Sequence, residues 1–267
     1  MENKKEYHIL SLSGGKDSTA LAFFMKENMP EIFDKLELVF CDTECELPEL
    51  YDYLNKIEIF LDKKITRIKP PVSFEQIHSC YGFLPHPANR WCTVELKTKP
   101  FQKFLKQNYS DGIVNLYIGI RADESHRVNT ATSKIKFIKE IFPFVENAIN
   151  KKEVIQILDN AGIGLANFYS WKRRSGCYFC FYQNKMDWIS LYEHYPELFA
   201  KAVSMEKHHE KIKRNGYFGW NYKMPISTMV EPKNLKQIKE KYEKISQITQ
   251  EKQQQDIKSL LINSELF

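Results

Sequence analysis

Residues 8–19 read HILSLSGGKDST, and this stretch decides the fold. Its first five residues form an apolar run with the character of a β-strand, followed by two adjacent glycines and a helix-compatible segment. A strand that opens through a tight glycine turn into a helix directs several backbone N–H groups, and the positive end of the helix dipole, at one point. That point suits a phosphate, and Lys16 adds a compact positive charge. The stretch therefore predicts an α/β fold with a phosphate-binding turn after its first strand.

This turn differs from the common phosphate loop GxxxxGK[ST], because Asp17 follows the lysine and the glycines stand too close together. A plain tight turn before a helix is the alternative for so short a motif. We take Lys16 and Asp17 as catalytic candidates. The candidate nucleotide-binding residues in and beside the turn are Ser11, Ser13, Gly14, Gly15, Lys16, Asp17, Ser18 and Thr19.

The composition indicates a globular protein. The chain has 267 residues, of which 43% are apolar and 13% aromatic, enough for one large or two modest domains. No signal-type apolar region precedes the first strand, and no run approaches the ~20 apolar residues of a membrane span, so we expect a cytoplasmic protein without a membrane partner. In that reducing compartment the six cysteines are better explained as metal ligands, reactive thiols or buried residues than as disulfides. A formal charge of +5 fits a polyanionic partner but does not require one.

Strand-like and helical patterns alternate through residues 1–165, which we expect to form the nucleotide-binding domain. The expected strands cover 8–12, 36–41, 64–69, 114–120 and 137–144. The expected helices cover 18–28, 48–61, 74–78, 94–107 and 151–160. Such alternation predicts a mostly parallel, five-stranded, doubly wound sheet with helices on both faces. Ligands of such sheets bind beyond the carboxyl ends of the strands, where residues 13–19, 42–43 and 121 are expected.

Residues 166–267 form a second region with a different pattern. Residues 171–180 are basic, aromatic and cysteine-bearing without a strand or helix period, whereas 186–209 and 234–266 read as helices. We expect a mainly helical region packed on the core. Basic and aromatic residues interleave at 169–174 and 211–223, a mixture that can stack bases and neutralise phosphates but also occurs where core aromatics have charged neighbours.

Three further segments carry candidate site residues. Residues 41–49 (CDTECELPE) place carboxylates after a strand, where they could receive a ribose hydroxyl or Mg²⁺, or simply favour a helix start. Residues 89–100 surround Cys92 with cations at a helix start, which favours a reactive or ligating thiolate over an inert one. The loop 119–127 contains Arg121, a third catalytic candidate whose guanidinium could receive phosphate oxygens.

The motif Cys177-Tyr178-Phe179-Cys180 has the spacing of a pair of metal ligands. One CxxC needs further ligands, and a second CxxC is absent from the sequence. Cys92 and Cys80 are the candidates for the remaining positions. The metal could be an iron–sulfur cluster or zinc, because both accept four thiolates in a tetrahedral arrangement.

Several segments, taken in order, resemble the phosphoadenosine phosphosulfate (PAPS) reductase family within the PP-loop, or adenine nucleotide α-hydrolase-like, superfamily. They are SGGKDS at 13–18, DTECELPE at 42–49, RWCTVELKTKP at 90–100, GIRADES at 119–125 and the CxxC at 177–180. The resemblance implies that ATP or a related adenine nucleotide lies on the turn, with Asp42 and Thr43 near its sugar or base. It implies further nucleotide contacts from Lys97, Gly119, Arg121, Glu124 and Ser125.

The same resemblance implies a [4Fe-4S] cluster. In the cluster-bearing branch of the family a Cys-Cys pair joins the later CxxC, whereas here Trp91-Cys92 replaces the pair. Either Cys80 supplies the missing ligand, or three thiolates leave one iron open, as in certain sulfur-transferring tRNA thiolases. Zn²⁺ held by Cys80, Cys92, Cys177 and Cys180 stays an alternative.

The leading hypothesis is a Mg²⁺-dependent ATP pyrophosphatase that activates an acceptor oxygen for sulfur transfer to a nucleic acid, closest in character to the DndC-like enzymes. Its expected partners are DNA or tRNA or a protein that modifies them, and a sulfur donor protein; we also allow for a homodimer. The first alternative is a sulfonucleotide reductase with another thiol donor, because no cysteine follows Cys180. The second is a non-catalytic nucleotide-binding module with structural zinc.

Overall fold

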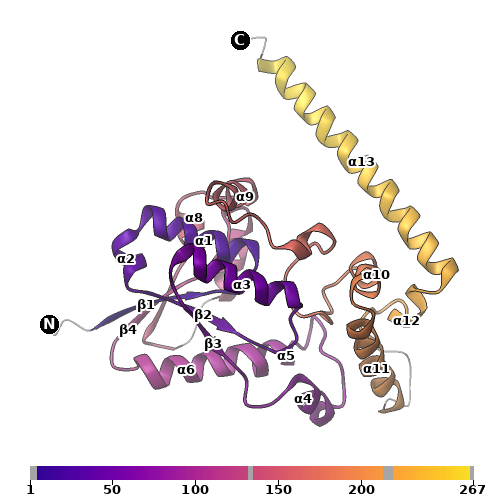
Figure 1. Cartoon of the computed structure of the whole chain (residues 1–267), viewed down its shortest axis with the longest axis horizontal. Helices are drawn as coiled ribbons and strands as arrows, with labels where there is room; N and C mark the ends of the chain where they lie inside the picture. The colour runs from indigo at the N-terminus through magenta and orange to yellow at the C-terminus, as the bar shows by residue number, and fades with distance from the viewer. Residues whose placement is uncertain (1–4, 132–134, 213–218, 265–267) are drawn as a thin grey trace. The chain divides into compact units, whose positions relative to one another are not determined.

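The computed structural model describes residues 5–131, 135–212 and 219–264. The chain divides into two compact units, Met1–Tyr178 and Phe179–Phe267, most of whose helices and strands are labelled in Figure 1. The change of sequence pattern predicts a boundary after residue 165, whereas the first unit extends through Tyr178. The reason is that segment 166–178 packs on the first unit: the N–H of Tyr178, for example, donates to the carbonyl of Cys45 at 2.9 Å.

A five-stranded, all-parallel sheet forms the centre of the first unit, which confirms the predicted α/β fold. The strands are β1 (Glu6–Ser11), β2 (Leu36–Cys41), β3 (Ile65–Ile68), β4 (Ile113–Tyr117) and β5 (Ile138–Ile141). Their order across the sheet is β3-β2-β1-β4-β5. The last two strands end earlier than predicted. After β5 the chain enters α8 (Pro143–Glu146), because proline cannot donate to a sheet ladder and is favoured at a helix start.

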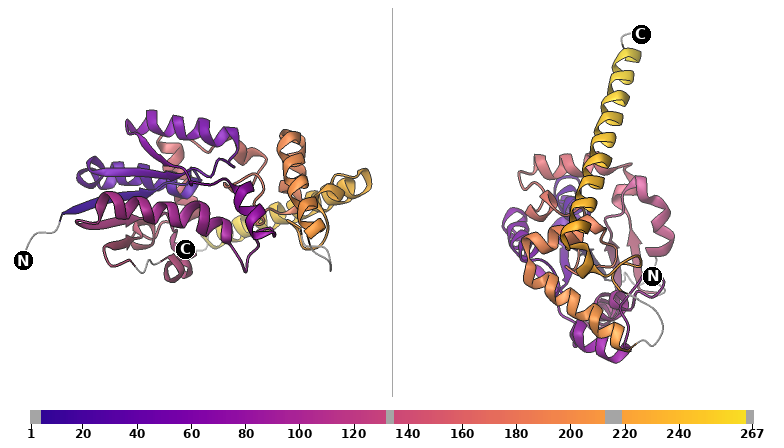
Figure 2. Two further views of the ribbon diagram at one scale, coloured as in Figure 1. Left: turned by 90° about the horizontal axis from the view of Figure 1, so that it is seen from below. Right: turned by 90° about the vertical axis from the view of Figure 1, so that its right-hand side faces the viewer.

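Helices lie on both faces of the sheet (Figure 2). On one face, α6 (Lys99–Tyr109) inserts Leu105 into a buried cluster with Ile9 and Val39. On the other, α1 (Lys16–Asn28) packs against α3 (Pro48–Leu61) and α9 (Lys151–Asn160). Because successive strand residues point to opposite faces, the apolar runs of the strands serve both layers at once.

The helices begin and end where local chemistry permits. α1 starts directly after the glycine turn and stops before Pro30, which opens the short helix α2 (Pro30–Asp34) that the sequence analysis did not predict. α3 also opens on a proline and ends at Asp62, whose φ of 51° is left-handed. α4 (Phe74–Tyr81) starts with a capping box, in which Ser73 and Gln76 each accept the other's N–H.

The helix predicted over 94–107 is divided into several parts. A turn of α-helix, α5 (Trp91–Thr93), leads into a π-helical turn, η1 (Val94–Thr98), and then into α6. π-helical turns are rare and frequently lie at functional sites. The remaining elements of the first unit are short: η2 (Ala122–Arg127), α7 (Val128–Ala131) and η3 (Asn167–Ser170).

The second unit is helical, as predicted. It contains α10 (Lys185–His194), α11 (Pro196–Ile212), α12 (Ile226–Met229) and α13 (Pro232–Ser264). The single helix predicted over 186–209 is two helices, because Pro196 lacks the N–H that would continue α10. Residues 213–218, which belong to the predicted basic and aromatic segment 211–223, lie outside the described residues.

A buried carboxylate organises the core of the second unit. Glu206 is 2% exposed and accepts the N–H of Trp220 through Oε1 and the N–H of Ile226 through Oε2, both at 2.9 Å. The indole of Trp220 stacks on Phe179, with ring centroids 5.4 Å apart. Glu206 thus connects α11 to the start of α12 without leaving a carboxylate oxygen unpaired. Within the described residues, no helix combines the length and the apolar character needed to cross a membrane.

Candidate functional site

β1 and β4 are neighbours in the middle of the sheet, with Leu10 beside Tyr117. From β1 the chain moves outward through β2 and β3, and it then returns to the other side of β1 to form β4. This reversal makes the carboxyl ends of β1 and β4 the topological switch point, where open parallel sheets bind ligands. The turn 13–18 leaves β1 there, and the loop 118–121 leaves β4 at the same end.

The turn is held in shape by its own hydroxyl groups. Ser18 Oγ accepts the N–H of Ser13 at 3.0 Å and lies 2.9 Å from Ser13 Oγ, and it lies within 3.2 Å of the Gly15 carbonyl. Gly14 has a φ of 68°, which L side chains rarely adopt. A Cβ on Gly15 would lie 2.5 Å from Ser175 Oγ. The shape of the turn therefore requires a glycine at position 14, whereas a side chain at position 15 would require Ser175 to move.

No side chain of the turn caps the N-terminus of α1. The first N–H groups of a helix have no acceptor within the helix, and the N-cap residue Gly15 has no side chain that could accept one of them. The N–H of Lys16 instead donates to the hydroxyl of Tyr169 at 3.0 Å. Tyr169 is not among the site residues that the sequence predicts, and only its place in the basic and aromatic segment 169–174 pointed to it.

The three catalytic candidates form one chain of ion pairs. Asp17 lies 2.6 Å from Lys16 Nζ through Oδ2 and accepts from Arg121 Nη1 at 2.9 Å through Oδ1. Arg121 also donates to Asp123 and Glu124, each at 2.8 Å. Asp17 therefore links the turn after β1 to the loop after β4. The side chain of Arg121 is 8% exposed, and its guanidinium is paired with three carboxylates.

These pairs fix the charges of the groups. Hydrogen bonds from Arg121 lower the pKa of Asp123, and hydrogen bonds to Asp123 and Asp17, against the cost of desolvation, raise the pKa of Arg121. Both groups consequently stay ionised around neutral pH.

The other predicted residues of this end of the sheet differ in accessibility. Gly119 lies against α1: a Cβ there would be 2.9 Å from the carbonyl oxygen of Asp17. Ser125 is exposed, and Ser11 is half-buried as the last residue of β1. Thr19 is fully buried, and its hydroxyl has no hydrogen-bond partner in the part of the chain that the structure describes.

A family model, that of the phosphoadenosine phosphosulfate reductase domain, matches residues 7–181. The matched range contains the turn, the Arg121 loop and both cysteines of the CxxC motif. The chain belongs to this family. The family match covers the sheet and the helices of the first unit almost entirely, and it confirms the resemblance that the ordered motifs indicated.

The chain is also similar to two curated proteins. One is MJ0973 of Methanocaldococcus jannaschii, an uncharacterized protein, which is 28% identical over 264 residues, covering 90% of this chain and 58% of that protein. The other is the nin region protein ORF290 of Escherichia phage lambda, which is 26% identical over 168 residues, covering 53% of this chain and 57% of that protein. The chain thus spans less than two thirds of the length of both family relatives.

Two solved structures are similar at low sequence identity. The PAPS reductase from Candida auris, solved as a phosphate complex, has a TM-score of 0.48 and 17% identity, over 64% of this chain and 80% of that one. The U34-tRNA thiolase NcsA from Methanococcus maripaludis, solved with its [4Fe-4S] cluster, has a TM-score of 0.44 and 15% identity, over 80% of this chain and 73% of that one.

The segment after β2 uses its predicted residues in internal contacts. Asp42 is 5% exposed, and its Oδ1 accepts the N–H of Glu44 at 2.9 Å and the hydroxyl of Tyr51 at 2.7 Å. Desolvation and this hydrogen bond raise the pKa of Tyr51. Thr43 is directed toward the thiol of Cys177, with Oγ1 and Sγ 3.4 Å apart. The end of β2 therefore connects the switch point to the segment that carries the CxxC.

Glu46, which the sequence analysis quoted but did not assign to the site, is central to this connection. Its side chain is 2% exposed, and Oε1 lies 3.3 Å from Thr43 Oγ1, 3.4 Å from Lys97 Nζ and 3.6 Å from Cys177 Sγ. Its Oε2 is buried and has no hydrogen-bond partner within the described residues. Desolvation lowers the pKa of Lys97, but the charge of Glu46, the neighbouring thiols and the hydrogen bond to Glu46 together outweigh it and raise that pKa overall. Lys97 therefore stays cationic beside the thiol.

The predicted metal ligands are not assembled within the described residues. No group of three or more His, Cys, Asp or Glu side chains with metal-binding geometry occurs there. Cys80 is exposed and lines a surface cavity at the end of α4, Cys92 is half-buried in α5, and Cys180 belongs to the second unit. Ligation by Cys80, Cys92, Cys177 and Cys180 stays a prediction, and we derive no chemical step through a cluster or zinc.

Lys172 and the residues around it hold the start of the CxxC motif. Its ammonium group donates to the carbonyls of Gly176 at 3.1 Å and Cys177 at 3.4 Å, and the residue is 2% exposed. Lys172 belongs to the basic segment that we considered for nucleic-acid binding. Its burial shows that this cation positions the backbone before Cys177 rather than facing an external phosphate.

Proposed function

We propose that this chain binds ATP at the β1/β4 switch point and cleaves it between the α and β phosphates, transferring adenylate to an acceptor oxygen. The transfer would activate that acceptor, which we take to be a nucleic acid, for sulfur insertion. The family match supports an enzyme that acts on an adenine nucleotide. The reaction type and the acceptor are our own inference.

One observation carries the proposal: the pair between Asp17 and Arg121, which brings the turn after β1 and the loop after β4 to one point. This places the amino end of α1, Lys16 and a buried guanidinium around the same position. Backbone N–H groups that are fixed before the substrate arrives stabilise charge as it develops without a cost of reorganisation, whereas Lys16 and Arg121 first have to exchange a carboxylate. A triphosphate is the ligand that such an arrangement favours.

The groups have distinct roles in this reaction. As the acceptor oxygen bonds to the α phosphorus and loses its proton, the bond to the bridging oxygen breaks and pyrophosphate leaves with the electron pair. Lys16 and the N–H groups of the turn offset the charge on that leaving group. Asp17 is a positioning residue for both cations. Arg121 exchanges a carboxylate for a phosphate oxygen as the nucleotide binds.

Mg²⁺ fits the chemistry of this end of the sheet. Asp17, Asp123 and Glu124 supply the hard oxygen donors that Mg²⁺ prefers, and the ion is usually held by one or two carboxylates together with substrate phosphates. When bound with ATP, it would reduce the negative charge that the turn has to accommodate.

Pyrophosphate release tests the proposal directly. The protein, with ATP and Mg²⁺ and with single- or double-stranded nucleic acid, should form AMP or an adenylated product together with pyrophosphate. Lys16→Ala should lower the rate by about 10²-fold or more, because it removes a fixed charge at the leaving group. Lys152→Ala is the matched control, since this exposed lysine lies in α9 outside the site.

The products separate the alternatives. Formation of ADP and phosphate, or equal rates for wild type and Lys16→Ala, would contradict the proposal. Tight ATP binding without turnover under any of these conditions would instead support the non-catalytic nucleotide-binding module.

A second candidate function, reduction of a sulfonucleotide, is favoured by the family match itself. Cys177 lies beside the ion pair of half-buried Lys97 with buried Glu46, and we infer that its thiol could take part in such a reduction. Sulfite formation from PAPS or adenosine phosphosulfate, with thioredoxin or dithiothreitol as the reductant, tests this function. The absence of sulfite while pyrophosphate is released from ATP would decide in favour of the first candidate.

A further inference from the structure

An aromatic stack reaches the surface of the first unit at the end of α4. Phe74 and Trp91 are buried and stack with ring centroids 5.0 Å apart and planes at 27°. Tyr81 stacks on Trp91 with centroids 5.3 Å apart and planes at 18°, and it is 43% exposed. The hydroxyl of Tyr81 donates to Glu95 Oε1 at 3.1 Å. The outermost ring of the stack is therefore held in a fixed plane at the surface.

A cavity of about 360 Å³ lies beside this ring. Apolar side chains form part of its wall, together with the thiol of Cys80 and the ion pair of Glu95 with Lys99, whose charged atoms are 2.6 Å apart. Its size lies within the range of small-ligand sites. A planar heterocycle can enter it, stack on Tyr81, and meet hydrogen-bonding groups at its edge.

A line of lysines begins at the same cavity. Lys99, Lys103 and Lys106 are spaced four and three residues apart on α6, so they share one exposed face of the helix, which we call the α6 lysine stripe. The opposite face packs into the core through Leu105. α6 contains no acidic residue, and at 1.5 Å per residue the stripe extends about 10 Å from the cavity.

We propose that this surface binds single-stranded nucleic acid, with one unpaired base on Tyr81 in the cavity and the adjoining phosphates along the α6 lysine stripe. Stacking on an aromatic side chain next to a positive track is how sequence-tolerant single-strand sites work. The stripe complements a phosphate backbone, and the ring with its cavity requires a base that is not stacked in a duplex. This inference rests on the proposed function, since it supplies the surface that recognises the acceptor.

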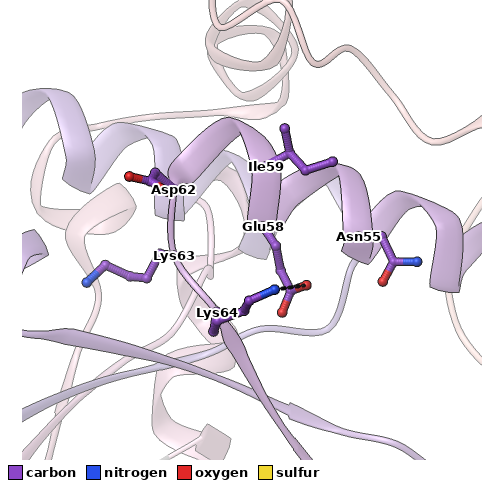
Figure 3. A pocket seen from close by; sticks show the side chains of 6 residues that line it. All are labelled: Asn55, Glu58, Ile59, Asp62, Lys63 and Lys64. Carbon is purple, nitrogen blue, oxygen red and sulfur yellow. Dashed lines mark ion pairs between the residues drawn. The ribbon is translucent and has the colours of Figure 1, made fainter.

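A second surface cavity, of about 540 Å³ at the end of α3, provides a comparison (Figure 3). Its charged residues are Glu58, Asp62, Lys63 and Lys64, so its two lysines are matched by two carboxylates, and no aromatic side chain lines it. Lys63, which is half-buried, and Lys64, which is exposed, can therefore serve as a control for the removal of two lysines from the surface of the first unit.

Fluorescence anisotropy with a 5′-fluorescein-labelled oligo(dT) of twelve nucleotides tests the proposal in the absence of ATP. Tyr81→Leu should weaken binding about tenfold, because the stacking surface is lost. Tyr81→Phe loses the hydrogen bond to Glu95 but keeps the ring and its stack on Trp91, so its affinity should stay within about twofold of the wild type. Lys103→Gln with Lys106→Gln should weaken binding at low salt and lower the slope of log K against log salt by about 1.4, whereas Lys63→Gln with Lys64→Gln should leave that slope unchanged.

Several results would overturn the inference. These are no binding of oligo(dT) by the wild type, equal affinities for Tyr81→Leu and Tyr81→Phe, or equal salt slopes for the two double variants. The same measurement with a twelve-base-pair duplex is a further test. Tyr81→Leu should change the affinity of the protein for the duplex less than twofold. A loss of affinity as large as that for the single strand would exclude base stacking. Circular dichroism melting of each variant checks that folding is retained.

Cys80 gives an independent readout, because its thiol lines the cavity. Saturating oligo(dT) should slow its alkylation by iodoacetamide, followed by mass spectrometry, and an unchanged rate would contradict base binding there. The proposed function is tested separately by Lys16→Ala. If pyrophosphate release fails while oligo(dT) still binds through Tyr81, the proposed function is overturned alone; if release is normal and Tyr81→Leu has no effect, this inference is overturned alone.

Discussion

Burial distinguishes the cysteines of the first unit from one another. Cys41 is half-buried, with its Sγ 3.7 Å from the carbonyl of Lys97, and Cys45 is 4% exposed. Desolvation raises the pKa of Cys41 to about 11, although the charge of Lys97 opposes the effect, and desolvation also raises the pKa of Cys45. Cys80, by contrast, is exposed. Because the thiolate is the nucleophile, these residues should differ in reactivity.

Alkylation by iodoacetamide measures this difference. At pH 8 only about one Cys41 thiol in 10³ is ionised, so Cys41 should react at least about tenfold more slowly than Cys80 in the native protein. Raising the pH toward 11 should accelerate the reaction of Cys41, since the thiolate fraction grows as the pH approaches the pKa. Mass spectrometry of tryptic peptides gives both rates, and a sample unfolded in urea is the control. Equal rates for Cys41 and Cys80 in the native protein would contradict the prediction.

The candidate site residues that the sequence could predict are those that belong to a contiguous motif. Lys16, Asp17 and Arg121 follow strands that the sequence pattern locates, and the parallel sheet brings such strand ends together. Tyr169 and Glu46 enter the site through contacts between segments far apart in the chain. No local pattern records a contact of that kind, so sequence reasoning missed both residues.

At the scale of elements, the site depends on how closely the loop after β4 approaches α1. Gly119 lies where a Cβ would be 2.9 Å from the carbonyl oxygen and 3.0 Å from the carbonyl carbon of Asp17. Both atoms belong to the backbone, so they cannot move aside as a flexible side chain could. The absence of a side chain at this position is therefore what permits Arg121 to reach Asp17.

Gly119→Ala should destabilise the protein by about 1–3 kcal/mol, because the loop has to move away from α1. The entropy that alanine removes from the unfolded chain stabilises by only about 0.4–1 kcal/mol, so the clash dominates. Urea unfolding monitored by circular dichroism measures the change. Ser125→Ala, an exposed position in the same loop region, should change stability by less than about 0.5 kcal/mol. If the Gly119→Ala protein were as stable as the wild type, the contact between the loop at residue 119 and α1 would not be tight.

The elements themselves were largely predictable, and the exceptions have local causes. The strands and the long helices of the first unit follow the apolar periodicity. The π-helical turn Val94–Thr98 was not anticipated, because its sequence suits an ordinary helix equally well. α2 contains only five residues, too few to show a helical period. The break before Pro196 was visible in the sequence as a proline, although the helical pattern on both sides obscured it.

At the scale of the whole molecule, ligand binding should appear as stability. A ligand that binds only the folded state stabilises it by about 2.7 kcal/mol at a concentration 100 times its Kd. For a protein of this size, that corresponds to a rise in Tm of roughly 5–10 °C. α,β-Methylene-ATP with Mg²⁺ is the appropriate ligand, because it cannot be cleaved at the relevant bond. Differential scanning fluorimetry should show this rise for the wild type and a clearly smaller one for Lys16→Ala. No rise at millimolar ligand would contradict nucleotide binding.

The hydrogen bond from the N–H of Lys16 to the hydroxyl of Tyr169 has a consequence for nucleotide affinity. One N–H cannot serve two strong acceptors at full strength, so a phosphate oxygen that takes this donor has to displace the phenol. The contribution of this N–H to nucleotide affinity is then the difference in free energy between its hydrogen bond to the phosphate and its hydrogen bond to Tyr169. Tyr169 lies eight residues before Cys177 in the chain, so a nucleotide that takes this donor, as the proposed function requires, would release the phenol at the start of the segment that leads to that thiol.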